Sequence, residues 1–229
     1  MANRVLISDI DQPHADKVEE AIVDGYGSDI SADIETRIAQ TFANDVTYAV
    51  ANGFEAIVRS VSAPVGSDVS GAVSAYGSDI AVFFPLGSNT SSELSYPPTL
   101  LVIVTSGAGD TQNQTAFGNG LEFWDVESVD VGFQSSFSNG VVAGKMLKIK
   151  DGRAGSWWDA RYAARQTASN AGVWDKNDGY GKIDVTAAVA FAGAVPSDPY
   201  ANTIIIYAAS DYTARYAGSY SCLNNYCTV

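Results

Sequence analysis

Basic side chains are scarce in this sequence. Its 229 residues include 13 lysines and arginines against 26 aspartates and glutamates, which gives a net charge of −13. A strongly acidic protein is repelled by phosphate backbones, so we expect no nucleic-acid partner. The longest apolar runs, 99–104 and 204–209, fall far short of the roughly 20 residues that a membrane helix needs, so we expect no membrane insertion.

Cysteine and histidine are also rare. The two cysteines, Cys222 and Cys227, could form a local disulfide or remain thiols in a reducing compartment. The single histidine, His14, is distant from them in the sequence, and structural zinc needs about four ligands, so we expect no metal and no other cofactor. Residues 1–5 lack the apolar core of a secretory signal. We therefore expect a protein made in the cytoplasm, with a virion as one destination.

Strand-like and helix-like hydrophobic patterns alternate along the chain. This order predicts a mostly parallel sheet with helices on both faces. With 46% hydrophobic residues, the chain can bury one sizeable core. The expected strands cover residues 4–8, 55–61, 80–84, 100–105 and 202–207, and the expected helices cover 15–23, 31–53, 68–76, 135–149, 156–169 and a segment after Gly181.

Several of these segments, in this order, resemble the subtilisin-like serine peptidases over residues 5–194. Residues 179–189, Gly-Tyr-Gly-Lys-Ile-Asp-Val-Thr-Ala-Ala-Val, resemble the last core helix of the family and its approach. Residues 135–144, Ser-Ser-Phe-Ser-Asn-Gly-Val-Val-Ala-Gly, are similar to the motif that carries the family's nucleophile, with Ser136 at that position. The resemblance implies a three-layer, subtilisin-like α/β domain over residues 1–195.

Two more site positions are implied by the resemblance. Residues 5–9 are similar to the strand that ends on the family's catalytic aspartate, here Asp9, and residues 80–89 are similar to the strand leading to its oxyanion-stabilising asparagine, here Asn89. The family's base lies in a His-Gly-Thr segment, which does not occur here, and His14 looks like a non-catalytic histidine of the family. We therefore interpret Asp9, Asn89 and Ser136 as vestigial and expect no enzymatic activity.

The leading functional prediction is a non-catalytic structural or binding component of a larger assembly, such as a phage or virus particle. It implies protein partners, as a homo-oligomer or as a subunit of that assembly. One alternative is a serine-carboxyl peptidase of the sedolisin type, in which Glu20 and Asp24, one helical turn apart, would act with Ser136. Another is a soluble carbohydrate- or peptide-binding module with tryptophans around an open cleft, namely Trp124, Trp157 and Trp158.

Residues 196–229 do not resemble the family, and we interpret them as a tyrosine-rich appendage. Tyrosine offers a large contact area with a polar tip, which is why interfaces are enriched in it. The segment predicts either an arm that docks on a neighbouring subunit or a β-hairpin that covers an edge of the sheet. The interface candidates are Tyr200, Tyr207, Tyr212, Tyr216, Tyr220 and Tyr226.

Lysine and arginine are distributed unevenly. None occurs between Val61 and Gly144, whereas six fall within residues 145–165. This cluster predicts either a docking surface for an acidic partner or a solvated helix face.

Overall fold

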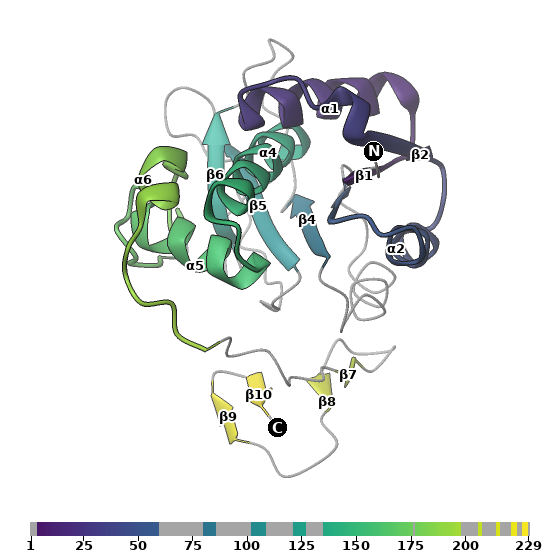
Figure 1. Cartoon of the computed structure of the whole chain (residues 1–229). Coiled ribbons are helices and arrows are strands. Elements are labelled where there is room, and N and C mark those ends of the chain that lie inside the picture. The colour runs from purple at the N-terminus through teal and green to yellow at the C-terminus, as the bar shows by residue number, and fades with distance from the viewer. Residues whose placement is uncertain are drawn as a thin grey trace.

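Six parallel strands form one sheet in the order β2-β1-β3-β4-β5-β6 (Figure 1). The computed structural model describes residues 4–59, 80–85, 102–108, 121–126, 135–175 and 177–197, together with four short strands nearer the carboxyl terminus. The six strands are β1 (Val5–Asp9), β2 (Ile34–Ile38), β3 (Ala56–Arg59), β4 (Ala81–Pro85), β5 (Val102–Ala108) and β6 (Leu121–Val126).

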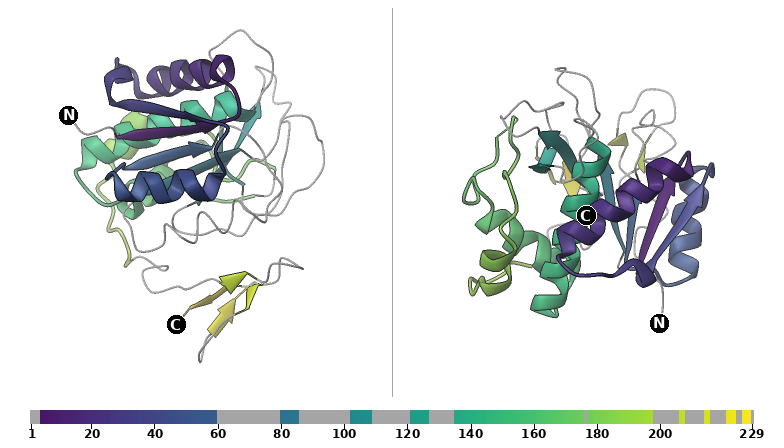
Figure 2. Two further views of the ribbon diagram at one scale, coloured as in Figure 1. Left: turned by 90° about the vertical axis from the view of Figure 1, so that its right-hand side faces the viewer. Right: turned by 90° about the horizontal axis from the view of Figure 1, so that it is seen from above.

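Helices cover both faces of this sheet, which confirms the predicted three-layer α/β fold. One core lies between the sheet and α1, α4, α5 and α6, and a smaller core lies under α2 on the other face. The left view of Figure 2 shows the strands between α1 and α2. The helices are α1 (Gln12–Tyr26), α2 (Phe42–Ala51), α4 (Ser135–Arg153), α5 (Trp157–Thr167) and α6 (Val185–Ala190), with a 3-10 turn, η1 (Ser31–Asp33).

Strand β1 supplies side chains to both cores because successive residues point to opposite faces. Val5 and Ile7 belong to the larger core, and Leu6 belongs to the smaller one. The same alternation continues at the carboxyl end of the strand. Ser8 bonds to a residue of α2, and Asp9 bonds to a residue of α1. The end of β1 therefore delivers polar groups to both faces.

The predicted helix over residues 31–53 is wrong. The structure has η1, β2 and α2 in its place. Ile34 and Ile38 are four residues apart, a spacing that keeps two side chains on one face of a helix and also on one face of a strand. A new helix begins after Thr41, whose hydroxyl accepts a hydrogen bond from the Asn44 amide at 3.3 Å.

The other described elements agree better with the sequence. The predicted helices over 135–149 and 156–169 are confirmed as α4 and α5. Strand β6 was not predicted, because Glu122 and Asp125 interrupt its apolar pattern. The helix predicted over 68–76 lies outside the described residues. Within the described part of the chain, no helix has the length and apolarity needed to cross a membrane.

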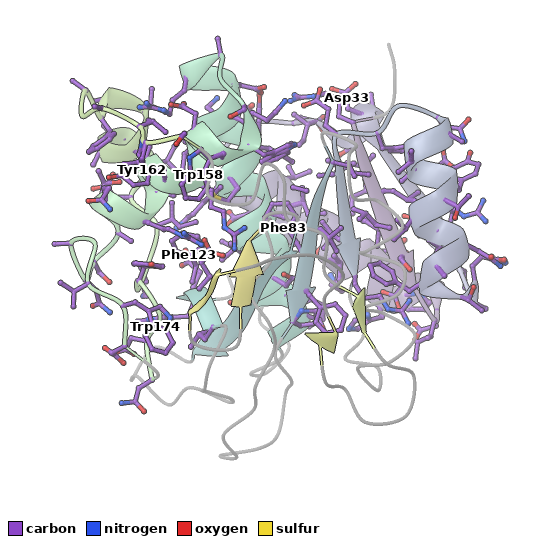
Figure 3. The ribbon with its side chains drawn as sticks, turned by 90° about the horizontal axis from the view of Figure 1, so that it is seen from below. Asp33, Phe83, Phe123, Trp158, Tyr162 and Trp174 are labelled. Carbon is purple, nitrogen blue, oxygen red and sulfur yellow. The ribbon has the colours of Figure 1, made fainter. Side chains whose placement is uncertain are left out.

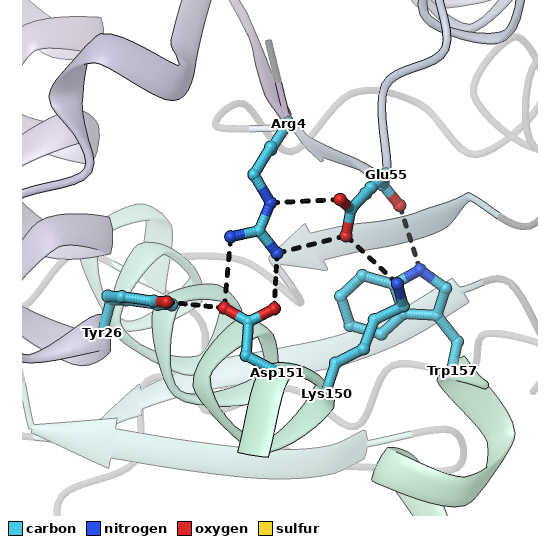
Figure 4. A network of polar contacts seen from close by, with 6 residues as sticks. All are labelled: Arg4, Tyr26, Glu55, Lys150, Asp151 and Trp157. Atoms are coloured by element: carbon cyan, nitrogen blue, oxygen red, sulfur yellow. Dashed lines mark hydrogen bonds and ion pairs between the residues drawn. The ribbon is translucent and has the colours of Figure 1, made fainter. Parts of the chain in front are cut away.

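A polar network at the amino ends of the strands holds the last turn of α4 (Figure 4). Arg4, just before β1, donates from Nε to Glu55 Oε1 at 3.1 Å and from a terminal nitrogen to Asp151 Oδ1 at 2.8 Å. Lys150 pairs with Glu55 at 3.1 Å, and the Tyr26 hydroxyl donates to Asp151 at 2.5 Å. Because Asp151 and Lys150 are in α4, the network fixes this helix to the ends of β1 and α1.

Five of the six basic residues in the cluster over residues 145–165 form ion pairs within the protein, and the sixth, Lys148, lies over the ring of Tyr26. Arg161 and Arg165 both bind the buried carboxylate of Glu122 on β6, and Arg161 is 1% exposed. Lys145 on α4 pairs with Asp125 on β6 at 2.5 Å. Arg161, Arg165 and Lys145 therefore hold helices onto the sheet. They form neither the docking surface nor the solvated helix face that the sequence predicted.

Two antiparallel strand pairs near the carboxyl terminus are separate from the main sheet. They are β7 (Ile206–Tyr207) with β8 (Ala214–Arg215), and β9 (Ser221–Leu223) with β10 (Tyr226–Thr228). Cys222 and Cys227 are opposite each other in the β9–β10 backbone register. The disulfide remains a prediction, as do the boundary near residue 195 and the contacts of the tyrosine-rich appendage, because these side chains lie outside the described part.

Candidate active site

Asp9 is fully buried at the carboxyl end of β1 and is held in one orientation. Its Oδ1 accepts hydrogen bonds from the amides of Ile10 at 2.5 Å and Asp11 at 3.3 Å. Its Oδ2 lies 2.7 Å from Nδ1 of His14. Because the backbone fixes one carboxylate oxygen, the other is directed at the imidazole. In this arrangement the carboxylate selects the tautomer with the proton on Nδ1, which makes Nε2 the basic nitrogen.

A short connection between β1 and α1 brings these two residues together. Asp11 is the N-cap of α1, and its carboxylate accepts a hydrogen bond from the His14 amide at 2.9 Å. Pro13 lies in the first turn of the helix, where a missing amide donor costs no hydrogen bond. His14 therefore sits in the first turn of α1, at the carboxyl edge of the sheet.

Helices α1 and α4 run side by side in the same direction, and their backbones touch. A Cβ added to Gly144 would lie 2.1 Å from the carbonyl oxygen of Ile22, and one added to Gly140 would lie 3.0 Å from that of Val18. Gly140 and Gly144 follow Val18 and Ile22, respectively, by the same number of positions in the sequence, so one register relates the two helices. One turn nearer the amino termini, this register brings His14 opposite Ser136.

Ser136 lies in the first turn of α4 and is buried. The adjacent residue, Phe137, has its ring centroid 5.3 Å from that of the His14 imidazole. This contact is independent of the glycine spacing and shows that the first turns of α1 and α4 meet. Asp9, His14 and the helical turn that carries Ser136 therefore gather at one place, with the residue types of a Ser-His-Asp triad.

The sequence offered no base because no His-Gly-Thr segment occurs, but the structure has His14 beside Asp9. His14 pairs with the aspartate at the predicted position, and it does so from the first turn of α1. The sequence search missed it because it required a His-Gly-Thr segment. A usable signal was present, namely Asp9 at a strand end followed five residues later by a histidine in the proline-containing first turn of a helix.

Glu20 and Asp24, the two carboxylates of the sedolisin-type alternative, do not lie on the face of α1 that packs against α4. Glu20 has a side chain that is 53% exposed and pairs with Lys17 at 2.7 Å. Asp24 is also exposed. The face of α1 that packs against α4 is instead formed by apolar and small residues such as Val18 and Ile22. Glu20 and Asp24 therefore do not converge on Ser136.

The predicted tryptophan cleft is not formed by the residues proposed for it. Trp157 and Trp158 are 4% and 8% exposed. Figure 3 shows Trp158 close to Tyr162, and their ring centroids are 5.8 Å apart. Trp124 carries the ammonium of Lys182 over its ring, 4.5 Å from the centroid. Trp157 and Trp158 therefore pack inside the protein, and Trp124 is half-buried. The candidate oxyanion residue Asn89 lies outside the described residues.

Comparisons with known proteins identify the fold. No protein-family model matches the chain, and no curated protein matches it in sequence. MycP1 from the ESX-1 type VII secretion system is similar in structure, with a TM-score of 0.60 at 14% identity over 87% of this chain and 83% of that chain. The MycP3 protease of the ESX-3 system has a TM-score of 0.52 at 12% identity over 82% and 83% of the two chains.

A protease from Pseudoalteromonas arctica is also similar, with a TM-score of 0.53 at 14% identity over 71% of this chain and 64% of that chain. At such low identity the likeness establishes the fold alone. The chain therefore has a subtilisin-like α/β fold, as predicted.

The predicted non-catalytic scaffold is corrected by these findings. Solved structures that share the fold include proteases. The prediction also depended on finding no histidine for the site in the sequence, whereas Asp9 Oδ2 lies 2.7 Å from His14 Nδ1. Oligomeric state, protein partners and incorporation into a virion stay predictions.

Proposed function

We propose that this chain is a serine peptidase in which Ser136 is the nucleophile, His14 the general base and Asp9 the group that orients His14. The observation that carries the proposal is the 2.7 Å contact between Asp9 Oδ2 and His14 Nδ1, made where α1 meets the first turn of α4. The subtilisin-like fold adds support, because proteases share it. The substrates would be peptide or protein chains.

The chemistry would follow from the roles of the three side chains. A serine hydroxyl is a weak nucleophile, so Nε2 of His14 would remove its proton as Oγ of Ser136 attacks the peptide carbonyl. The imidazolium formed in this step would be stabilised by the carboxylate of Asp9. His14 would then donate the proton to the leaving amine, and a water molecule would hydrolyse the acyl-enzyme by the same route.

The start of α4 would also stabilise the developing negative charge. The first turn of any α-helix presents amide donors without intrahelical acceptors, and its positive dipole end favours an anion. A tetrahedral intermediate on Ser136 would place its oxyanion beside these amides. Donors in such a position contribute about 3 kcal/mol of transition-state stabilisation in serine peptidases.

The test combines active-site labelling with peptide hydrolysis. A fluorophosphonate probe should label the wild-type protein on Ser136, and both labelling and hydrolysis of an unstructured protein such as casein should be lost in Ser136→Ala and His14→Ala. The matched control is the double variant Glu20→Gln/Asp24→Asn, which alters two exposed carboxylates of the same helix and should retain wild-type rates. Labelling that survives in Ser136→Ala, or that depends on Glu20 and Asp24, would overturn the proposal.

A further inference from the structure

Arg59, the last residue of β3, lies between the two halves of the proposed site and is 6% exposed. Its guanidinium donates from a terminal nitrogen to Ser8 Oγ at 2.9 Å, and Ser8 immediately precedes Asp9. Its carbonyl oxygen accepts a hydrogen bond from Asn139 Nδ2 at 2.9 Å. Asn139 follows Ser136 by three residues in α4, slightly less than one helical turn. One buried residue is therefore bonded both to the strand of Asp9 and to the helix of Ser136.

The hydrogen bonds continue across the α2 face of the sheet. Ser8 Oγ donates to Asp45 Oδ2 at 2.5 Å, and Asp45 Oδ1 accepts from Arg37 Nε at 2.7 Å. Asp45 is fully buried. Buried charges are costly unless opposite charges accompany them. Arg37 pairs directly with Asp45, and Arg59 shares Ser8 Oγ with Asp45, so Arg59 adds a second cation on the α2 side of β1, one residue along the strand from Asp9.

We propose that Arg59 is a positioning residue for this site, acting through β1 on the Asp9–His14 pair and through Asn139 on the start of α4. The inference rests on the proposed function, because the atoms it positions are those of the proposed triad. Its electrostatic effect can nevertheless be measured without catalysis. A fixed cation on the α2 side of β1, beside the residue before Asp9, disfavours the imidazolium form of His14, which keeps the base ready to accept a proton.

Other charges near His14 come from its own helix and from the strands behind it. Helix α4 contributes none in its first two turns, since residues 135–144 contain no charged side chain. Among the described residues, α1 and its N-cap carry Asp11, Asp16, Lys17, Glu19, Glu20 and Asp24, and the elements behind His14 carry Asp9, Glu35, Arg37, Asp45 and Arg59.

The decisive measurement is the NMR titration of His14, whose signal is unambiguous because the chain has a single histidine. Arg59→Met removes the charge but keeps an unbranched side chain, and it should move the midpoint of the titration upward by about half a pH unit. Arg59→Lys keeps the charge and should restore most of the wild-type midpoint. Arg4→Met removes an equal charge at the opposite end of β1 and should leave the midpoint unchanged.

Activity measurements complete the test. The pH at which fluorophosphonate labelling of Ser136 is half-maximal should rise in Arg59→Met in parallel with the titration, whereas a merely structural role would lower labelling equally at every pH. If Arg59→Met does not fold, Ser8→Ala, which removes the contact holding the guanidinium to β1, should give a smaller shift of the same sign. An unchanged midpoint in the folded variant overturns the inference. A shifted midpoint in a protein that never labels at Ser136 would instead refute the proposed peptidase while retaining the effect of Arg59.

Discussion

Asp9 interacts with backbone donors and with His14 at the same time, and this restricts which residue can replace it. An asparagine at position 9 would have to present its oxygen to the amides of Ile10 and Asp11, which directs its NH2 group at His14 Nδ1. Nδ1 would then be the acceptor, so the proton would move to Nε2. The ring would have the wrong tautomer to act as a base toward Ser136.

Asp9→Asn should therefore fold normally and lose activity by about 10⁴-fold. Hydrolysis rates measure the loss, and ¹⁵N chemical shifts of the single histidine report the tautomer. The contrast is Asp11→Asn, which can still cap α1 and should keep most of the activity. Wild-type rates in Asp9→Asn would show that the carboxylate does not orient the base.

Glu122 is a second buried carboxylate, and its role is structural. Burial alone would raise its pKa, but the charges and hydrogen bonds of Arg161 and Arg165 outweigh that effect and hold the pKa below its usual range. Glu122→Gln would leave the buried guanidinium of Arg161 without a counter-charge. We expect the free energy of unfolding to fall by about 3–5 kcal/mol.

Chemical denaturation of Glu122→Gln measures this loss. Glu20→Gln is the comparison, since its exposed pair with Lys17 should contribute no more than about 1 kcal/mol. Equal stabilities of the two variants would mean that burial of the Glu122 ion pairs has no net effect.

At the scale of elements, the packing of α1 on α4 decides where His14 meets Ser136. The close approach at Gly144 leaves no room for a side chain, because the obstacle is the backbone oxygen of Ile22. Gly144→Ala should separate the helices and destabilise the protein by about 1–3 kcal/mol, despite the higher helix propensity of alanine. The first turns of both helices would shift with it, so kcat should fall more than KM rises.

A matched substitution exists in the same helix. A Cβ on Gly152 would meet only the side chain of Val189, whose methyl groups can move aside. Gly152→Ala should change the free energy of unfolding by less than about 1 kcal/mol and leave kcat intact. If both variants lost kcat equally, the register of α1 and α4 would not control the site.

The sequence predicted the elements whose hydrophobic pattern is unambiguous. Helix α4 and strand β1 were found because their buried faces are continuous, and the family motif located Ser136. The segment around β2 was misassigned because the spacing of Ile34 and Ile38 suits a helix as well as a strand. The role of Arg59 depends on contacts with residues 51 and 80 positions away, which no local pattern encodes.

At the scale of the whole molecule, ion pairs at the amino edge of the sheet couple stability to pH. Burial alone would raise the pKa values of Glu55 and Asp151, but Arg4, aided by Lys150 for Glu55 and by Tyr26 for Asp151, outweighs it and lowers both. A carboxylate with a lowered folded pKa stabilises the protein fully above its unfolded pKa, about 4.3 for Glu and 3.9 for Asp. That contribution is lost as the pH falls through the folded pKa.

The free energy of unfolding should therefore decrease below about pH 4.5, although protonation also relieves the repulsion of a chain with net charge −13. Denaturant titrations between pH 7 and pH 3 measure this slope. Asp151→Asn removes one of the carboxylates responsible, so it should be less stable than the wild type at pH 7 and should approach it in stability as the pH falls. Parallel curves for the two proteins would mean that the network anchoring α4 to β1 does not contribute to acid sensitivity.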